Sequence, residues 1–352
     1  MENQVIFDQL VKNSLDFLEK SIDEFDQSPK FSLIHFCIAI ELLFKARLAH
    51  EHWTLIVLDI NKVQSKEKFL GGDVKTISHS EALIRIETIL EENLASSIGE
   101  QIKNLFGVRN RLIHFLGNTS GEGIKEETIS HQLVSWHNLY NLYLDKSWKE
   151  IFKGYNKEIS ALDHKLRKHK KYLKIRFDHK IPIIEKLKKI GKQFTTCPVC
   201  GFHALSEEQI SSCLKNFKCH VCSYETRHYD ILTCPACSDY IVMDSNEDVC
   251  FCKGCKKNFQ ADEVVEAFKE VNPLTKDNYF EGHPIAHCIE CFGLDCVLQI
   301  DEGNLWVCVY CKGEYTMQEV SHCEWCNDLN AGNLEDSFLI GCNACTGNHD
   351  FK

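Results

Sequence analysis

Eight pairs of cysteines, each with two residues between its members, lie in the second half of the chain. Random placement of 20 cysteines among 352 residues would give roughly one such pair. Two cysteines with this spacing in a tight turn present their sulfur atoms on one side, and two such turns complete a tetrahedral shell around zinc. The pairs are Cys197/Cys200, Cys219/Cys222, Cys234/Cys237, Cys252/Cys255, Cys288/Cys291, Cys308/Cys311, Cys323/Cys326 and Cys342/Cys345.

Consecutive pairs are separated by intervals that suit a short hairpin, so the sequence predicts four structural zinc ions, each held by four thiolates. We expect zinc ribbons 1 and 2 over residues 193–258 and zinc ribbons 3 and 4 over residues 284–348. Closed four-thiolate shells leave no coordination position for water, so no catalytic metal is expected. Four histidines lie close enough to the pairs to act as alternative ligands: His203, His220, His287 and His322. The four cysteines outside the pairs are expected to be buried thiols: Cys37, Cys213, Cys250 and Cys296.

The cysteine array also contains an internal repeat. Cys219 and Cys308 are separated by 89 residues, and so are Cys234 and Cys323. A constant offset indicates that a pair of ribbons was duplicated, with residues 256–287 as the spacer. In the third ribbon, the strand-like runs 297–300 and 305–307 predict a hairpin between the two cysteine pairs.

The amino terminus bears on the compartment in which the chain works. Met1-Glu2-Asn3-Gln4 is neither a basic signal-peptide start nor an acid-poor presequence, and no stretch approaches the about 20 apolar residues that span a bilayer. We therefore expect a cytoplasmic protein without a membrane partner. In that compartment paired cysteines indicate zinc rather than disulfides.

Charge is distributed unevenly along the chain. Residues 1–163 sum to −6, residues 164–192 to +10 and residues 193–352 to −15. The acidic ribbons disfavour a phosphate backbone as ligand, which argues against a transcription-associated nucleic-acid-binding zinc protein. A protein partner for the ribbon array fits the negative charge of this segment better than a nucleic acid does.

The first 150 residues predict an all-α helical bundle. Apolar residues recur at helical spacing in a stripe that includes Ile6, Leu10 and Leu18. A second helix from about residue 31 to 50 is apolar on nearly every side and should form the centre of the bundle. Two charged residues one turn apart, Glu41 and Lys45, interrupt it, and an ion pair within the helix would account for them.

Arg109-Asn110-Arg111-Leu112-Ile113-His114 falls on a late helix of this bundle. With that R-N-x-x-x-H string, and with an earlier helix reading A-I-E-L-L-F-K, residues 1–150 resemble the HEPN superfamily. The resemblance implies a dimeric, metal-independent endoribonuclease of the toxin–antitoxin or antiviral-defence type. It also implies that Arg109, Asn110 and His114 are catalytic and that Glu41 and Lys45 support them.

Helix geometry limits how these residues meet. Asn110 and His114 are one turn apart on the same face, whereas Arg109 points away from His114 by about 140°. Arg109 must therefore reach round the helix, or two copies of the motif must meet across a dimer, as the resemblance implies. His114 would then take the proton of a ribose 2′-hydroxyl while Arg109 stabilises the phosphate. Arg47 and His52 fit the same spacing and provide a second match to the pattern.

The sequence of residues 151–192 predicts a basic helical connector, and we expect its helix to end near Pro182. Lys168, Lys170, Lys171 and Lys174 are candidate RNA-binding residues, and Tyr172 and Phe177 could stack on unpaired bases. The alternative is a solvated linker.

Together these features predict a cytoplasmic, dimeric HEPN-like ribonuclease that acts on RNA and uses its zinc ribbons to recognise a partner or trigger. The alternative is a non-catalytic dimeric adaptor, in which an inactive helical scaffold carries zinc ribbons that bind another protein.

Overall fold

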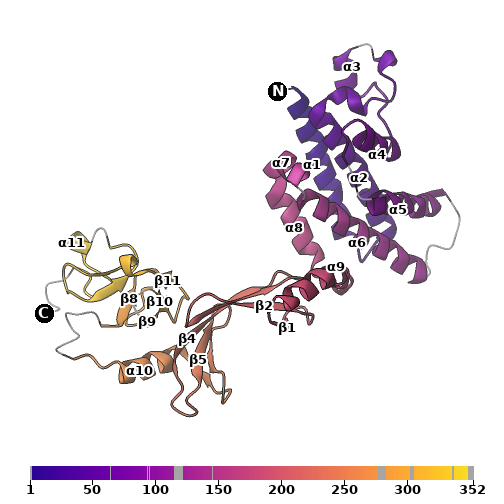
Figure 1. The fold of residues 1–352 in the computed structure, drawn as a ribbon. Helices are drawn as coiled ribbons and strands as arrows, with labels where there is room; N and C mark the ends of the chain where they lie inside the picture. The colour runs from indigo at the N-terminus through magenta and orange to yellow at the C-terminus, as the bar shows by residue number, and fades with distance from the viewer. Residues whose placement is uncertain are drawn as a thin grey trace. The chain divides into compact units, whose positions relative to one another are not determined.

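The computed structural model describes residues 2–63, 65–92, 94, 96–114, 122–144, 146–275, 283–301, 305–334 and 337–347. The chain divides into two compact units, Met1–Ile181 and Pro182–Lys352 (Figure 1). The residues assigned to the connector are shared between these units, and the first unit takes most of them.

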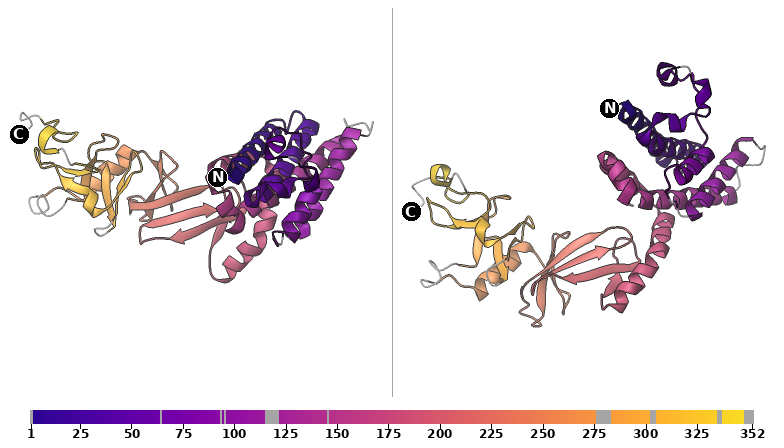
Figure 2. Two further views of the ribbon diagram at one scale, coloured as in Figure 1. Left: turned by 90° about the horizontal axis from the view of Figure 1, so that it is seen from above. Right: turned by 45° about the horizontal axis from the view of Figure 1, so that its top comes forward.

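The first unit is a helical bundle, as the apolar periodicity predicts, and Figure 2 shows it from two further sides. Its α-helices are α1 (Glu2–Asp23), α2 (Pro29–Glu51), α3 (Lys66–Leu70), α4 (His79–Thr88), α5 (Ser96–His114), α6 (Glu122–Leu144), α7 (Lys146–Ile151), α8 (Asn156–Leu166) and α9 (Lys170–Lys189). The short 3-10 turns are η1 (Trp53–Ile56), η2 (Ile60–Lys62) and η3 (Lys153–Tyr155).

Helix α2 forms the centre of this bundle and packs against α1, α4, α5 and α6. Phe44 and Ala46, which lie on nearly opposite sides of α2, are both completely buried, which is why its sequence lacks a polar stripe. Pro29 occupies the first helical turn, where its missing N–H costs nothing. Ser78 caps α4 and forms the predicted capping box with Glu81.

Two helix ends differ from the sequence prediction. Helix α5 begins at Ser96, so Ser97, which has capping-box spacing to Glu100, lies inside the first turn rather than before it. Helix α9 continues through Pro182 to Lys189 instead of ending near the proline. A proline in a helix interior removes one backbone hydrogen bond but does not force the helix to end.

A buried carboxylate fixes α8 and α9 to the bundle. Asp163 is completely buried and accepts hydrogen bonds from the indole Nε1 of Trp136, at 3.2 Å, and from the Tyr172 hydroxyl. Its Oδ2 also lies 3.1 Å from Nη1 of Arg176, which is itself buried. The first part of the basic segment is thus a packed element of the helical unit.

The second unit begins with a seven-stranded antiparallel sheet in which each strand pairs with the next along the chain. Strand β4 runs from the second cysteine pair to the third, so ribbons 1 and 2 share one sheet. The strands are β1 (Phe194–Thr196), β2 (His203–Gln209), β3 (Leu214–Cys219), β4 (Glu225–Thr233), β5 (Tyr240–Asp244), β6 (Cys250–Cys252) and β7 (Asn258–Phe259).

Ribbons 3 and 4 form a six-stranded sheet in which β8 pairs in parallel with β13. The predicted hairpin of the third ribbon is confirmed, because β9 and β10 pair antiparallel. Its strands are β8 (Ile285–Cys288), β9 (Val297–Asp301), β10 (Leu305–Cys308), β11 (Glu314–Tyr315), β12 (Val320–His322) and β13 (Leu329–Ala331). A 3-10 turn, η4 (Met317–Glu319), and a short helix, α11 (Ser337–Ile340), complete it.

The spacer between the two ribbon pairs carries an amphipathic helix, α10 (Ala261–Val271). Val264, Val265 and Phe268 of α10 belong to one hydrophobic core with Tyr229 of ribbon 2 and Trp306 of ribbon 3. Ribbons 2 and 3 therefore share a core and are not independent modules.

Within the described ranges, every helix is too short or too polar to cross a lipid bilayer.

Candidate metal centres and the Arg109 cluster

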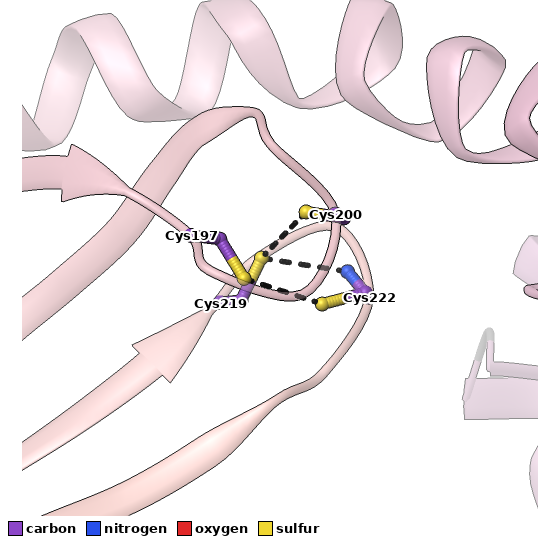
Figure 3. Close-up of side chains that lie close together, drawn as sticks. All are labelled: Cys197, Cys200, Cys219 and Cys222. Atoms are coloured by element: carbon purple, nitrogen blue, oxygen red, sulfur yellow. Dashed lines mark hydrogen bonds between the residues drawn. The ribbon is translucent and has the colours of Figure 1, made fainter.

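Sixteen cysteines come together in the four groups of four that the sequence predicts, and in each group the sulfur atoms lie within 4.8 Å of one another. In the first group Sγ of Cys197 lies 3.6 Å from Sγ of Cys222, and Cys200 and Cys219 are equally close (Figure 3). A tetrahedron with metal–sulfur bonds of about 2.3 Å has edges of about 3.8 Å. Each group can therefore hold a metal ion, and the all-thiolate donor set is consistent with zinc.

One backbone conformation repeats at all eight cysteine pairs. The residue directly after the second cysteine always has a positive φ, between 50° and 75°. In the first pair this residue is glycine, and in the other seven it is not. The positions are Gly201, Ser223, Ser238, Lys256, Phe292, Lys312, Asn327 and Thr346.

Backbone hydrogen bonds show why the left-handed residue is needed. Its N–H donates to the carbonyl of the first cysteine, for example from Ser223 to Cys219 at 3.1 Å and from Lys312 to Cys308 at 3.0 Å. The N–H of the first cysteine donates in turn to a carbonyl five residues later, as from Cys219 to Tyr224 at 2.7 Å. The tight turn directs both sulfur atoms to the same side.

Hydrogen-bond donors favour the thiolate form at some of the sulfur atoms, such as Cys219, whereas burial raises the pKa of others, such as Cys200. In the first group the Cys222 thiol, followed by backbone N–H groups, lowers the pKa of Cys219 to about 5 despite its burial. In the third group the Tyr315 hydroxyl lies 3.1 Å from Sγ of Cys288, and Cys296 lies 3.5 Å from Sγ of Cys308. Cys296 is completely buried, as expected for a cysteine outside the pairs, but its position beside a ligand sulfur could not be read from spacing.

The four candidate replacement histidines lie outside the sulfur groups, which contain cysteine alone. His203 is exposed, and His220 lies 3.1 Å from the Ser206 hydroxyl. His322 places Nδ1 2.8 Å from the carbonyl of Asn327. The fourth, His287, belongs to a polar network.

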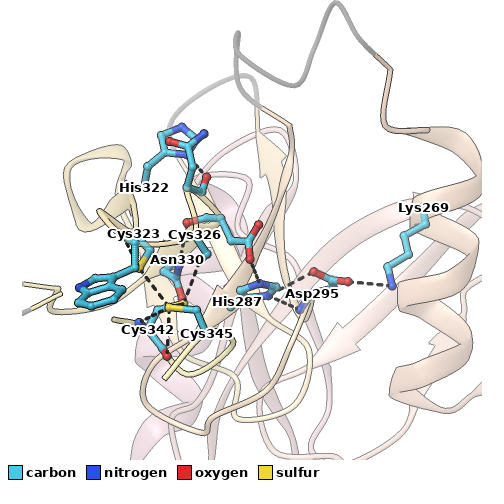
Figure 4. Close-up of polar contacts among 12 residues, drawn as sticks. Lys269, His287, Asp295, His322, Cys323, Cys326, Asn330, Cys342 and Cys345 are labelled. Atoms are coloured by element: carbon cyan, nitrogen blue, oxygen red, sulfur yellow. Dashed lines mark hydrogen bonds and ion pairs between the residues drawn. The ribbon is translucent and has the colours of Figure 1, made fainter. Parts of the chain in front are cut away.

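That network lines a cavity of about 400 Å³ beside ribbons 3 and 4. Figure 4 shows Asp295 between His287 and Lys269, with Oδ1 3.2 Å from Nδ1 of His287 and Oδ2 3.2 Å from Nζ of Lys269. His287 and then Lys269 lower the pKa of Asp295 to about 2 against the effect of burial. Burial alone would lower the pKa of His287, but Asp295 and Asp328 outweigh it and raise that pKa. The charged forms of His287, Lys269 and Asp295 therefore stabilise one another in this network.

In the helical unit, Arg109 of α5 lies beside α2. Its guanidinium carbon is 5.5 Å from the ring centre of Phe106, and Nη1 donates to Oδ1 of Asn110 at 2.8 Å. Its Nε is buried without a hydrogen-bond partner. Glu41 and Lys45 form the expected ion pair at 2.7 Å, and Lys45 also donates to the Thr76 hydroxyl at 3.0 Å.

His114 is the last residue of α5 and is exposed, and no contact joins it to Arg109 in the described part of the chain. The two side chains point in different directions, as their separation of five residues implies. The structure of one chain thus brings Arg109 and Asn110 together but does not bring His114 to them.

The second match to the motif has structural roles. Arg47 is buried in ion pairs with Glu92 and with Glu51, the latter at 2.8 Å. His52 precedes η1 and accepts a hydrogen bond from the backbone N–H of Thr54. Arg47 therefore helps to hold the bundle, and the exposed His52 caps the short turn η1.

All four candidate RNA-binding lysines are exposed, as the sequence analysis requires. Lys171 pairs with Glu126 of α6 at 2.9 Å, and Lys174 pairs with Asp178. The expectation that Tyr172 stacks on bases is wrong, because its ring is completely buried and its hydroxyl donates to Asp163. Phe177 remains partly exposed.

His79, at the start of α4, escaped the sequence analysis. Its imidazole stacks on Phe106, with ring centres 3.4 Å apart and planes 9° from parallel. Burial lowers the pKa of His79, and Glu41, Arg109 and Lys45 all act on it electrostatically. No periodic pattern connects His79 with Arg109, since the two residues approach only when α4 packs beside α5.

Compared with family models, with curated proteins and with solved structures, the chain gives no match.

Proposed function

We propose that the protein is a metal-independent endoribonuclease of the HEPN type, from a toxin–antitoxin or antiphage-defence system. The observation that carries this proposal is the state of Arg109. Within the described residues its guanidinium forms no ion pair with a carboxylate, although it lies close enough to Glu41 and Lys45 for all three to act on His79. A guanidinium group that pairs with no carboxylate of the protein is suited to binding a phosphate group.

The reaction needs a base for the ribose 2′-hydroxyl as well as a cation for the phosphate. The HEPN resemblance assigns that base to His114. Because His114 and Arg109 do not meet within one chain, this assignment requires a homodimer in which the two motifs face each other.

The cysteine groups, in this proposal, bind four structural zinc ions, and the ribbons bind a protein partner or trigger. Support comes from the acidic charge of the ribbon segment and from the exposed apolar side chains of Phe292 and Leu294 beside the third site. The basic exposed face of α9 would attract RNA.

The decisive experiment incubates the purified protein with single-stranded RNA without added metal, and with EDTA applied too briefly to strip the ribbons. We expect cleavage that leaves 2′,3′-cyclic phosphate or 2′- or 3′-phosphate ends, whereas DNA survives because it lacks the attacking hydroxyl. Arg109→Ala should lower the rate by about a hundredfold or more. His52→Ala, at the second motif match, is the matched control and should cleave at nearly the wild-type rate.

Absence of cleavage by the wild-type protein, with its trigger or partner present, would refute the enzyme proposal. So would an Arg109→Ala variant that cleaves at the wild-type rate. The non-catalytic adaptor would then be the better account of the molecule.

A further inference from the structure

Cys296, one of the four cysteines outside the pairs, lies between the two turns that form the third metal site. Its Sγ is 3.5 Å from Sγ of Cys308, the first cysteine of the second turn. The carbonyl of Gly293 closes the first turn, and a Cβ atom on Gly293 would lie only 2.6 Å from the Cys296 sulfur. Only a residue without a side chain therefore leaves room for this sulfur, which is enclosed by both turns.

The backbone of Cys296 is fixed where strands β9 and β10 meet. Val297 of β9 lies opposite Cys308 of β10, and the carbonyl of Cys296 accepts a hydrogen bond from the N–H of Val309 at 2.9 Å. The distance of 3.5 Å between the two sulfur atoms is close to the about 3.8 Å that separates two sulfur ligands of one tetrahedral ion. Cys296 thus stands as near to Cys308 as a ligand would, although it lies outside the group of four.

Ribbons 1 and 2 make the same backbone contact without a thiol at this place. In each ribbon the residue after the third cysteine donates its N–H to a carbonyl across the hairpin. That carbonyl belongs to Ala204 in ribbon 1, to Tyr240 in ribbon 2 and to Cys296 in ribbon 3. Among these three ribbons the additional sulfur is a property of the third, and ribbon 1 provides a matched comparison.

We propose that Cys296 is a reserve ligand of the third metal site and can take the place of Cys308 on the ion. In this exchange the bond between the Cys308 sulfur and the ion breaks and a bond to the Cys296 sulfur forms. The Cys296 thiol gives its proton to the departing Cys308 thiolate. Four thiolates hold the ion before and after, so the exchange needs no oxidant and leaves the net charge unchanged. This inference rests on the zinc assignment in the proposed function and is independent of the ribonuclease activity.

A reserve ligand allows the third site to keep its ion when Cys308 is lost. Ribbon 3 shares its hydrophobic core with ribbon 2 and α10, so the ion of this site supports more than its own ribbon. A structural ion and the fold around it stabilise each other. Tolerance at the third site therefore protects the part of the array in which the ribbons are coupled.

The test replaces the same ligand in ribbons 3 and 1 of the full-length, zinc-loaded protein. Cys308→Ser should keep close to four zinc ions, because Cys296 supplies the fourth thiolate. Cys219→Ser is the matched control, with Ala204 where ribbon 3 has its reserve thiol. It should hold the first ion about a hundredfold or more weakly, since even groups around a ligand are worth about 10–100-fold in affinity. Chelator titration followed by plasma emission spectrometry measures both.

Two further variants separate a reserve ligand from a residue that only packs. Cys296→Ser keeps the size of the side chain and a hydrogen-bond donor, and should keep all four ions while Cys308 is present. Combined with Cys308→Ser, it should release the third ion as readily as Cys219→Ser releases the first. Cobalt(II) in place of zinc reports the number of thiolates through its charge-transfer absorption. Cys308→Ser should keep the wild-type absorption, and the double variant should lose part of it.

The outcomes distinguish this inference from the metal assignment. If Cys308→Ser releases its ion as readily as Cys219→Ser does, Cys296 is not a reserve ligand and the four zinc sites stand. The same holds if Cys296→Ser alone loses an ion, or if it does not weaken the third site of Cys308→Ser further. A wild-type protein that binds one zinc or none refutes the metal assignment and this inference together, whatever its activity on RNA.

Discussion

The residue that follows each second cysteine adopts the left-handed conformation, although only Gly201 is a glycine. In most residue types this conformation costs roughly 1–2 kcal/mol because Cβ crowds the backbone. The seven other turns tolerate the cost because the N–H of the left-handed residue satisfies the carbonyl of the first cysteine, and a metal ion held by both sulfur atoms would add to this. Exposed side chains such as Ser223 and Lys256 show that backbone geometry alone sets these positions.

Ser223 offers a direct test of this strain. Ser223→Gly should stabilise the first ribbon by up to about 1 kcal/mol, because glycine reaches positive φ without a Cβ clash. Ser223→Val should destabilise it, because a β-branched side chain resists this conformation most strongly. Ser223→Ala, which keeps the Cβ atom, is the control and should change little. The stability of the variants is compared by the concentration of chelator that releases half of the zinc from the first ribbon. Equal concentrations for the glycine and valine variants would contradict the explanation.

At the scale of elements, two carboxylates organise the helical unit, Asp163 completely buried and Glu92 partly buried. Glu92 accepts from Arg47 and from the indole of Trp148, and Asp163 gathers Trp136, Tyr172 and Arg176. Buried charges of this kind are costly unless every partner is in place. They explain why α8 and the first half of α9, although they read as a charged linker, are packed parts of the bundle.

Asp163→Leu should therefore destabilise the helical unit by about 3 kcal/mol or more, because it removes the carboxylate that pairs with the buried guanidinium of Arg176. Asp178→Asn is the matched control on the exposed side of α9 and should cost less than about 1 kcal/mol. Urea unfolding followed by far-UV circular dichroism measures both. Equal midpoints for the two variants would show that the network does not hold the helices.

The exposed side of the basic segment carries the four candidate RNA-binding lysines. Replacing Lys168, Lys170, Lys171 and Lys174 with glutamine should weaken RNA binding and reduce its dependence on salt, by up to about one unit of slope for each phosphate that a lysine no longer neutralises. Zinc content should stay the same. Fluorescence anisotropy over a range of salt concentrations measures the slope. An unchanged slope would show that these lysines do not contact RNA phosphates and are only solvated surface residues.

At the scale of the whole molecule, the ribbon unit is built from coupled parts. Ribbons 1 and 2 share β4, and ribbons 2 and 3 share a hydrophobic core with α10. Loss of one zinc ion should therefore affect its neighbours, whereas the helical unit has its own core and should keep its structure.

Intact protein should accordingly carry close to four zinc ions, which plasma emission spectrometry can count. Cys234→Ser should remove about one zinc and also loosen ribbon 3, because the Cys234 side chain belongs to the core that Trp306 shares. Cys37→Ser, in the helical unit, should leave the zinc content unchanged. A protein that binds one zinc or none would overturn the metal assignment, and an undisturbed ribbon 3 would overturn the coupling.

The sequence by itself determined the four groups of four cysteines that can hold metal ions, and the helical character of the first unit. A C-x-x-C turn is local, so its spacing fixes which sulfur atoms can share an ion, and the apolar periodicity of α1 and α2 fixes which faces are buried. Even the pairing of β9 with β10 follows from residues close in the chain.

Only the tertiary structure decided what meets across the bundle. It placed His79 on Phe106 beside Arg109, left His114 exposed at the helix end, and buried Tyr172 on Asp163. These contacts depend on how α2, α4 and α5, and likewise α6, α8 and α9, pack together. Their side chains are tens of residues apart, and no local period encodes which of them face one another. The physical reason is that packing selects partners by shape and burial over the whole core, whereas spacing in the sequence specifies only a few turns of chain.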